Sequence, residues 1–210
     1  MKFVSIILAR GGSVGIPKKN LIDLNGKPLI HYTANASLAS QVSETWVSSN
    51  CIEILEEAIK LGCSTISRPD HISKSDSKSE DALLHFAQHV DFDGLVFIQP
   101  TSPLLKSEDI NSALEMMNDY DSVFSAYKEH WIPEWNLNNT PKDWDFHNRP
   151  MRQDVPETYV ENGAFYITTK KQLLASKLRY SGNIGIFNMP KIRSFQIDTK
   201  EDLEIVSKLC

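Results

Sequence analysis

The chain has 210 residues, enough to bury one sizeable core, and its 41% hydrophobic and 23% charged residues exclude the disordered and fibrous classes. A formal net charge of −5 argues against a nucleic-acid-binding protein, which would present a basic face. Three cysteines without a CxxC spacing argue against a disulfide framework or a zinc site. The apolar run at residues 3–9 is too short to span a membrane, so we expect a cytoplasmic protein with no membrane partner.

Short apolar runs alternate with segments of helical period through the first part of the chain. The runs that we expect to form strands are residues 3–9, 46–49, 64–67, 94–99 and 121–126. The segments that we expect to form helices are residues 28–40, 52–62, 79–90 and 107–119. We expect Pro28 to begin the first of these helices, Gly62 to close the second, and Ser79 and Ser107 to be the N-caps of the last two.

This alternation predicts an α/β fold: a Rossmann-like, mostly parallel sheet with helices on both faces, in a single domain over residues 1–210. Ligands of such sheets bind beyond the carboxyl ends of the strands. The segments that follow Ala9 and Gln99 are therefore the first candidates for a binding site.

The pattern breaks at about residues 128–160, a stretch with three of the four tryptophans and four prolines. A long irregular segment inside a domain is usually functional, and its aromatic content favours an interface over disorder. We expect an extended arm that contacts a second copy of the chain in a homodimer. After it we expect strands at 163–168, 184–189 and 193–198, and a final helix capped by Thr199 and Asp202.

The segment ARGGSVGIPKKN at residues 9–20 has the sharpest chemical pattern. Glycines after a buried strand let backbone N–H groups approach a phosphate chain, and Arg10, Lys18 and Lys19 add positive charge. The spacing is neither GxxxxGK[ST] nor GxGxxG. A tight turn with surface cations would also explain the pattern, but three cations in one glycine-rich loop favour polyphosphate binding.

The same loop, followed by GKPLI, resembles the N-terminal signature of the acylneuraminate cytidylyltransferases, the CMP-sialic acid synthetases, which runs close to ARGGSKGIPRKN. The resemblance extends over essentially the whole chain in the family's order, through RPD at 68–70, IQPTSPLL at 98–105, VFSAYKEH at 123–130, RPMRQD at 149–154, ENGAFYI at 161–167 and SFQIDTKEDL at 194–203. It implies a fold like that of the nucleotide-diphospho-sugar transferases.

The resemblance also implies an activity: a sialic-acid-type nonulosonic acid attacks the α-phosphorus of CTP, giving the CMP-sugar for cell-surface polysaccharide biosynthesis and releasing pyrophosphate. Its implied catalytic residues are Arg10, Lys19 and Asp198, with Asp198 holding Mg²⁺. Its implied nucleotide-binding residues are Ala9, Arg10, Gly11, Gly12, Lys19, Asn20, Arg68 and Ser79. Arg68 as a surface side chain and Ser79 as a helix cap are the structural alternatives.

The residues implied for the acidic nine-carbon sugar are Gln99, Thr101, Ser102, Arg152, Gln153, Asn162 and Tyr166. Neutral hydrogen-bonding groups suit a polyhydroxylated ring, and the guanidinium of Arg152 suits its carboxylate. For Tyr166 the alternative is core packing in a strand. No histidine lies in a metal-binding motif, and we assign none a catalytic role.

The chain departs from the family pattern at several positions. Val14 stands where a lysine is usual, with Lys18 nearby as a substitute charge, and Asn50 replaces an aspartate. Gln196 stands where the first aspartate of a DID pattern is expected, so its amide oxygen would have to replace a charged ligand. Two other activities fit the pattern: a cytidylyltransferase for Kdo or a related sugar, and a non-catalytic relative that only binds CTP or sugar.

Overall fold

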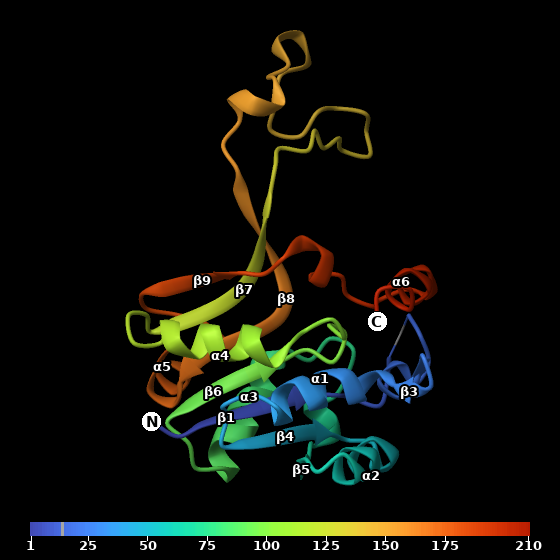
Figure 1. Ribbon diagram of the computed structural model, residues 1–210, viewed down its shortest axis with the longest axis vertical. Helices are drawn as coiled ribbons and strands as arrows, with labels where there is room; N and C mark the ends of the chain where they lie inside the picture. The colour runs from blue at the N-terminus through green and yellow to red at the C-terminus, as the bar shows by residue number, and fades with distance from the viewer. Residues whose placement is uncertain (14) are drawn as a thin grey trace.

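The computed structural model describes residues 1–13 and 15–210, in which one seven-stranded sheet is covered by helices (Figure 1). In spatial order the strands are β5-β4-β1-β6-β8-β7-β9. Their bounds are β1 Phe3–Leu8, β4 Glu44–Ser49, β5 Ser64–Ser67, β6 Gly94–Ile98, β7 Ser122–Glu129, β8 Thr158–Thr169 and β9 Ile184–Asn188. Strand β8 runs antiparallel to β6 and β7, and the other neighbouring strands are parallel, which confirms the mostly parallel sheet.

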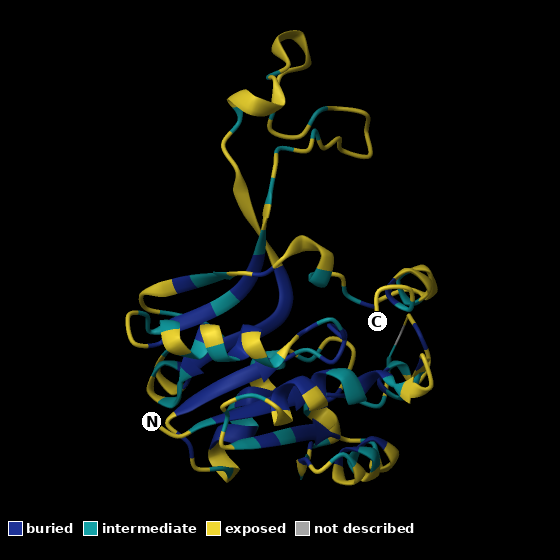
Figure 2. Ribbon diagram, in the orientation of Figure 1, coloured by how far each residue is buried: buried dark blue, intermediate teal, exposed yellow. Residues whose placement is uncertain are grey.

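Helices cover both faces of the sheet, as predicted. Their bounds are α1 Leu29–Leu38, α2 Ile52–Lys60, α3 Ser79–His89, α4 Ser107–Met116, α5 Lys170–Ser176 and α6 Lys200–Val206. Helices α1, α2 and α4 bury apolar residues in one core, and α3 and α5 bury theirs in a second core (Figure 2). The apolar run of β1 separates these cores, since Ile6 belongs to one and Ile7 to the other.

Two expected helix caps are wrong. Ser79 and Ser107 are the first residues of α3 and α4, and the residues before them, Lys78 and Lys106, take the N-cap positions. At α4 the carboxylate of Asp109, at the third helical position, accepts a hydrogen bond from the backbone N–H of Lys106 at 3.1 Å, which is the half of a capping box that an acid at this position provides. The expected cap of α6 by Thr199 and Asp202 is confirmed, as is the left-handed Gly62 that closes α2.

The strand expected at 193–198 is wrong as well. A short 3-10 helix (Lys191–Arg193) leads into an extended segment that joins no ladder. Its backbone is held from another direction: the N–H of Ile197 donates to the carbonyl of Thr101 at 2.9 Å, in the loop after β6. Helix α5 and the small hairpin of β2 (Asp23–Leu24) and β3 (Lys27–Pro28) were not predicted from the sequence.

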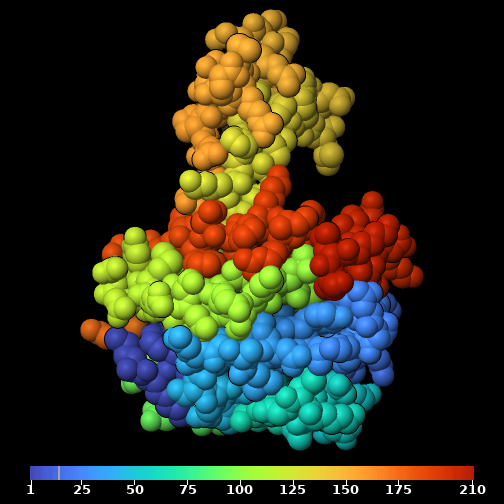
Figure 3. All heavy atoms as spheres, viewed as in Figure 1, coloured from blue at the N-terminus to red at the C-terminus, as the bar shows by residue number. Residues whose placement is uncertain are grey.

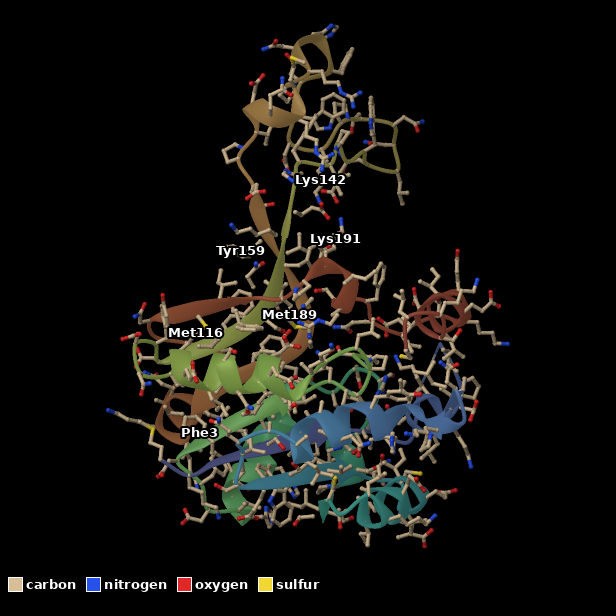
Figure 4. All side chains as sticks on the ribbon, in the orientation of Figure 1. Phe3, Met116, Lys142, Tyr159, Met189 and Lys191 are labelled. Atoms are coloured by element: carbon tan, nitrogen blue, oxygen red, sulfur yellow. The ribbon has the colours of Figure 1, made fainter. Side chains whose placement is uncertain are left out.

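An arm projects from the body, and β7 and β8 extend beyond the sheet to form its base (Figure 1). Its expected contact with a second copy of the chain stays a prediction. Residues 130–157 project from the body as a separate lobe (Figure 3), with Lys142 in the lobe and Tyr159 near its base (Figure 4). Trp144 packs edge-on against Trp131 and Trp135, with ring centroids 5.9 and 5.2 Å away. These contacts form a small aromatic cluster in the lobe, in which none of the three tryptophans is buried.

None of the helices in the described ranges is long and apolar enough to cross a membrane.

Candidate active site

A pocket of about 500 Å³ opens at the carboxyl ends of β1 and β6, the two places that the sequence indicated. Parallel strands end at the same edge of the sheet, so loops far apart in the chain meet there. The pocket is lined by Leu8, Arg10, Ser13, Gly15, Lys19, Asn20, Ser79, Phe97, Gln99, Pro100, Thr101, Gln196 and Asp198. The structure thus brings together the phosphate-loop cations, the loop after β6 and the C-terminal aspartate.

The glycine loop is shaped by close contacts with its neighbours. A Cβ on Gly11 would lie 2.7 Å from that of Cys51, and a Cβ on Gly15 would lie 2.8 Å from the carbonyl oxygen of Asp198. Both positions therefore require glycine. The buried side chain of Asn20 donates to the carbonyl of Arg10 at 2.9 Å and fixes the turn.

Other predicted loop residues are used differently. Ala9 is fully buried, and neither it nor Gly11 nor Gly12 lines the pocket. The backbone N–H of Gly11 donates to Asn50 Oδ1 at 3.0 Å. This N–H therefore stabilises the loop and does not face a ligand. Asn50 thus has a structural role at the position where the family pattern has an aspartate.

Two of the three predicted loop cations line the pocket. Lys19, whose side chain is only 16% exposed, reaches Asp198 Oδ1 with its Nζ at 2.7 Å. Arg10 lines the same space. Lys18 instead pairs with Glu53 of α2 at 3.3 Å, so it does not substitute for a charge at position 14. Val14 itself lies outside the described residues.

Arg68 does not line the pocket, but it is close enough to Arg10 for the two charges to repel, and its side chain is buried without an anionic partner among the described residues. The residue is 6% exposed, and its Nε and Nη2 atoms meet no hydrogen-bond acceptor in the described part of the chain. Burial first, and then repulsion by Arg10, lowers its pKa to about 10. A guanidinium that remains charged and unpaired favours the binding of an anion nearby. The surface alternative for Arg68 is therefore wrong.

The carboxylate of Asp198 is the one acid that lines this pocket, and it is 67% exposed. Mg²⁺ is usually held by one or two carboxylates, with substrate phosphates and water completing its shell. No cluster of three acidic, histidine or cysteine side chains suited to a metal occurs among residues 1–13 and 15–210. The donor set thus fits a magnesium ion that arrives with a polyphosphate, and it does not fit a cation held by protein alone.

The predicted sugar residues divide into four groups, of which Arg152 and Gln153, in the arm, are described last. Gln99 and Thr101 line the pocket. Asn162 and Tyr166 line an adjoining pocket of about 520 Å³, which shares Gln196 and Asp198 with the first. Ser102 is buried and lines neither pocket.

The buried side chains of Asn162 and Tyr166 are largely committed to the protein. Asn162 Oδ1 accepts from Ser125 at 2.6 Å, and its Nδ2 donates to Ser194 at 2.9 Å. The ring of Tyr166 stacks on Phe97 at 5.4 Å, and its hydroxyl donates to Glu161. Burial first, and then Glu161, raises the pKa of Tyr166 and keeps it protonated. Most of the Tyr166 side chain is therefore packed in the core, as the structural alternative stated, although the residue also lines the adjoining pocket.

Arg152 and Gln153 lie in the arm, in a short 3-10 helix that borders a separate pocket with Trp131 and Met151. One copy of the chain does not bring them to the pocket at the sheet edge (Figure 1). Four lining residues were not predicted from the sequence, although their positions at or beside the two predicted strand ends could have indicated them: Leu8, Ser13, Phe97 and Pro100.

Comparison with known proteins gives matches over almost the entire chain. A family described as "Cytidylyltransferase" matches residues 4–210. N-acylneuraminate cytidylyltransferase B of Danio rerio is 35% identical over 97% of this chain and 50% of its own length. Pseudaminic acid cytidylyltransferase of Campylobacter jejuni is 33% identical over 100% of this chain and 96% of its own length. The chain therefore spans about half the length of the N-acylneuraminate relatives and nearly all of the pseudaminic acid relative.

Among solved structures, a CMP:2-keto-3-deoxy-manno-octonic acid synthetase complexed with CTP superimposes with a TM-score of 0.76. It is 20% identical, and the match covers 100% of this chain and 98% of that one. At this identity the likeness shows the fold alone, a mostly parallel sheet covered by helices.

Proposed function

The chain belongs to the cytidylyltransferase family, and from that premise we propose that it transfers CMP from CTP to an acidic sugar of the sialic-acid type. The observation on which the proposal rests is the pocket at the ends of β1 and β6. Arg10 and Lys19 provide positive charge there, and Asp198 provides one exposed carboxylate. The buried Arg68, which has no partner among the described residues, adds a further positive charge close to Arg10. Excess positive charge beside a single acid suits a triphosphate and a divalent cation.

In the proposed reaction the anomeric hydroxyl oxygen of the sugar attacks the α-phosphorus of CTP. A new oxygen–phosphorus bond forms, the bond from the α-phosphorus to the bridging oxygen of the β-phosphate breaks, pyrophosphate leaves, and the hydroxyl proton passes to solvent. Such a step depends on alignment and charge neutralisation. Arg10 and Lys19 would neutralise the triphosphate, and Arg68 would help to hold the nucleotide.

Asp198 is the residue that would hold Mg²⁺. When bound, that ion would neutralise charge on the phosphate oxygens. Lys19 now pairs with Asp198, and it would exchange this partner for phosphate oxygens once CTP binds. The pair thus keeps both side chains at the pocket before the nucleotide arrives.

The sugar is expected to occupy the space between Gln99, Thr101 and the adjoining pocket. The second pocket is lined by Glu161, Asp198 and Asp202, so it suits the hydroxyl and amide donors of a sugar, whereas a carboxylate would be repelled there. The sugar carboxylate therefore needs a cation from elsewhere. Arg152 in the arm is the residue that we propose for it, with Gln153 beside it.

This role requires a second copy of the chain, because the arm projects from its own body (Figure 3). We propose a homodimer in which the arm of one copy reaches the pocket of the other. Its apolar side chains support such a contact: the exposed ones are Ile132, Trp135, Leu137, Phe146 and Met151. We also propose a cytoplasmic location, supported by three cysteines that remain free thiols.

The test is pyrophosphate release from CTP and Mg²⁺ with a panel of acids: N-acetylneuraminic, legionaminic and pseudaminic acid and Kdo. We expect turnover with at least one nine-carbon acid and little with Kdo, and Asp198→Asn is the inactive control. Turnover with Kdo alone would change the substrate class. Binding of CTP without pyrophosphate from any sugar would make the chain a binding protein and overturn the proposal.

A further inference from the structure

Gln196 lies where the two pockets meet and lines both of them. Each end of its side-chain amide has a partner within the protein. Nε2 donates to the backbone carbonyl of Asn162 in β8, and Oε1 accepts from the hydroxyl of Thr101 at 3.0 Å. A backbone carbonyl can only accept, so the nitrogen must face Asn162 and the oxygen must face Thr101.

These bonds join three parts of the chain at one point. Thr101 contacts two consecutive residues, since its hydroxyl donates to Gln196 and its carbonyl accepts from the N–H of Ile197 at 2.9 Å. Gly163, at φ +69°, presents no Cβ toward Gln196, and any Cβ there would collide with the amide. The loop after β6, strand β8 and the C-terminal segment are therefore held together through Gln196.

Asp198 lies two residues after Gln196, so the position of Asp198 follows from how the chain is held at Gln196. The side chain of Ile197, between them, is fully buried, and the carbonyl of Asp198 packs against Gly15. With the segment held on both sides, the carboxylate of Asp198 is placed next to Lys19. On the far side of the junction, the backbone N–H of Asp198 donates to Asp202 Oδ2 at 3.0 Å, and the carboxylate of Asp198 itself bonds only to Lys19 among the described residues.

We propose that Gln196 is a positioning residue for Asp198 and not a metal ligand. Its amide fastens the segment that presents the one carboxylate of the pocket, which leaves the protein a single acid for a divalent cation. This inference rests on the proposed function and assigns the residue a role in it. A carboxylate at position 196 would face the carbonyl of Asn162 with no hydrogen to donate, so a neutral amide suits this junction.

The experiment counts Mn²⁺ bound to the CTP complex by electron paramagnetic resonance, and it measures kcat and KM for CTP. In Gln196→Met we expect the same number of ions at saturation as in the wild type, with Mn²⁺ affinity and kcat each roughly tenfold lower or more. The KM for CTP should change much less than kcat, because the triphosphate contacts remain. Gln88→Met, on the exposed end of α3, is the matched control and should behave like the wild type.

Thr101→Val opens the same junction from the other side and serves if Gln196→Met folds poorly. The Thr101→Val and Gln196→Met losses in Mn²⁺ affinity should not multiply in the double variant, because both remove one connection. The inference would be overturned if Gln196→Met bound fewer Mn²⁺ ions at saturation or bound Mn²⁺ with unchanged affinity. It would also be overturned if the losses of the two single variants multiplied in the double variant. The Mn²⁺ measurements need no sugar, so they test the role of Gln196 separately from the proposed activity. A failure of the proposed activity would appear in the wild type alone, as an absence of pyrophosphate release.

Discussion

Replacing Arg68 by methionine should stabilise the protein and at the same time weaken its binding of CTP. The guanidinium is almost fully buried, and two of its nitrogens lack a partner in the described residues. Burial first, and then Arg10, lowers its pKa from 12.5 to about 10, which corresponds to about 3 kcal/mol against the charged form. Methionine keeps an unbranched chain of similar shape without the charge, so we expect the free energy of unfolding to rise by about 1–3 kcal/mol.

The sign of the pH dependence follows from the lowered pKa of Arg68. The charge is present in both the folded and the unfolded chain below about pH 10, so the whole penalty applies there. It is relieved only as the pH rises through about 10 toward the unfolded value of 12.5. The gain in Arg68→Met should therefore be constant between about pH 6 and 9.

Urea unfolding at several pH values, with and without CTP, measures both effects. CTP binding should become roughly tenfold to hundredfold weaker in Arg68→Met, because a charged hydrogen-bond donor is lost. Arg68→Lys retains the charge and should not be stabilised. A lower free energy of unfolding for Arg68→Met at an unchanged m-value would show that the guanidinium is well solvated or paired, and unchanged CTP affinity would remove Arg68 from the site.

Four further predictions concern separate parts of the molecule. Asp198→Asn should lower pyrophosphate release by roughly a hundredfold or more across a Mg²⁺ titration; recovery at high Mg²⁺ would contradict its role. Val14→Lys, a prediction from the sequence alone, should leave the turnover number equal or higher, and a large loss in the same assay would place that side chain away from the phosphates. Thr199→Ala should cost about 1 kcal/mol in urea unfolding. Burial alone would raise the pKa of Asp202, but hydrogen bonds from Thr199 and the backbone outweigh it, so the net pKa is lowered. The stability that the cap contributes should therefore be lost only below about pH 4; its loss near neutral pH would be inconsistent with this. Trp135→Asp should raise the dimer dissociation constant roughly hundredfold in sedimentation, without changing the unfolding of the body; an unchanged mass at micromolar concentration would argue against the arm as the contact.

Most of the body could be predicted from the sequence because local physics decides it. The runs at 3–9 and 94–99 are too apolar for anything but buried strands, and glycine at position 62 can take the left-handed turn that ends α2. Ser79 and Ser107 were misassigned because a helix boundary can shift by one residue without changing the buried face.

The extended segment at 194–198 could not be predicted in the same way. Its alternating pattern is that of a strand, but the partners of Gln196 and Ile197 are Thr101 and Asn162, far away in the sequence. Bonds from single residues to the loop after β6 and to Asn162 in β8 replace a strand ladder here, and the alternating pattern does not distinguish the two arrangements.

What the sequence determined by itself is the class of the protein: a mostly parallel α/β fold, a cationic glycine loop after its first strand, and the order of motifs that places it in its family. Only the tertiary structure decided which of those residues meet. It placed Lys19 beside Asp198, buried Arg68 without a partner among the described residues, paired Lys18 with Glu53 and kept Arg152 away from the pocket of its own copy. The reason is physical: apolar patterning and glycine act over a few residues, whereas the pairing of charges depends on where distant loops come together.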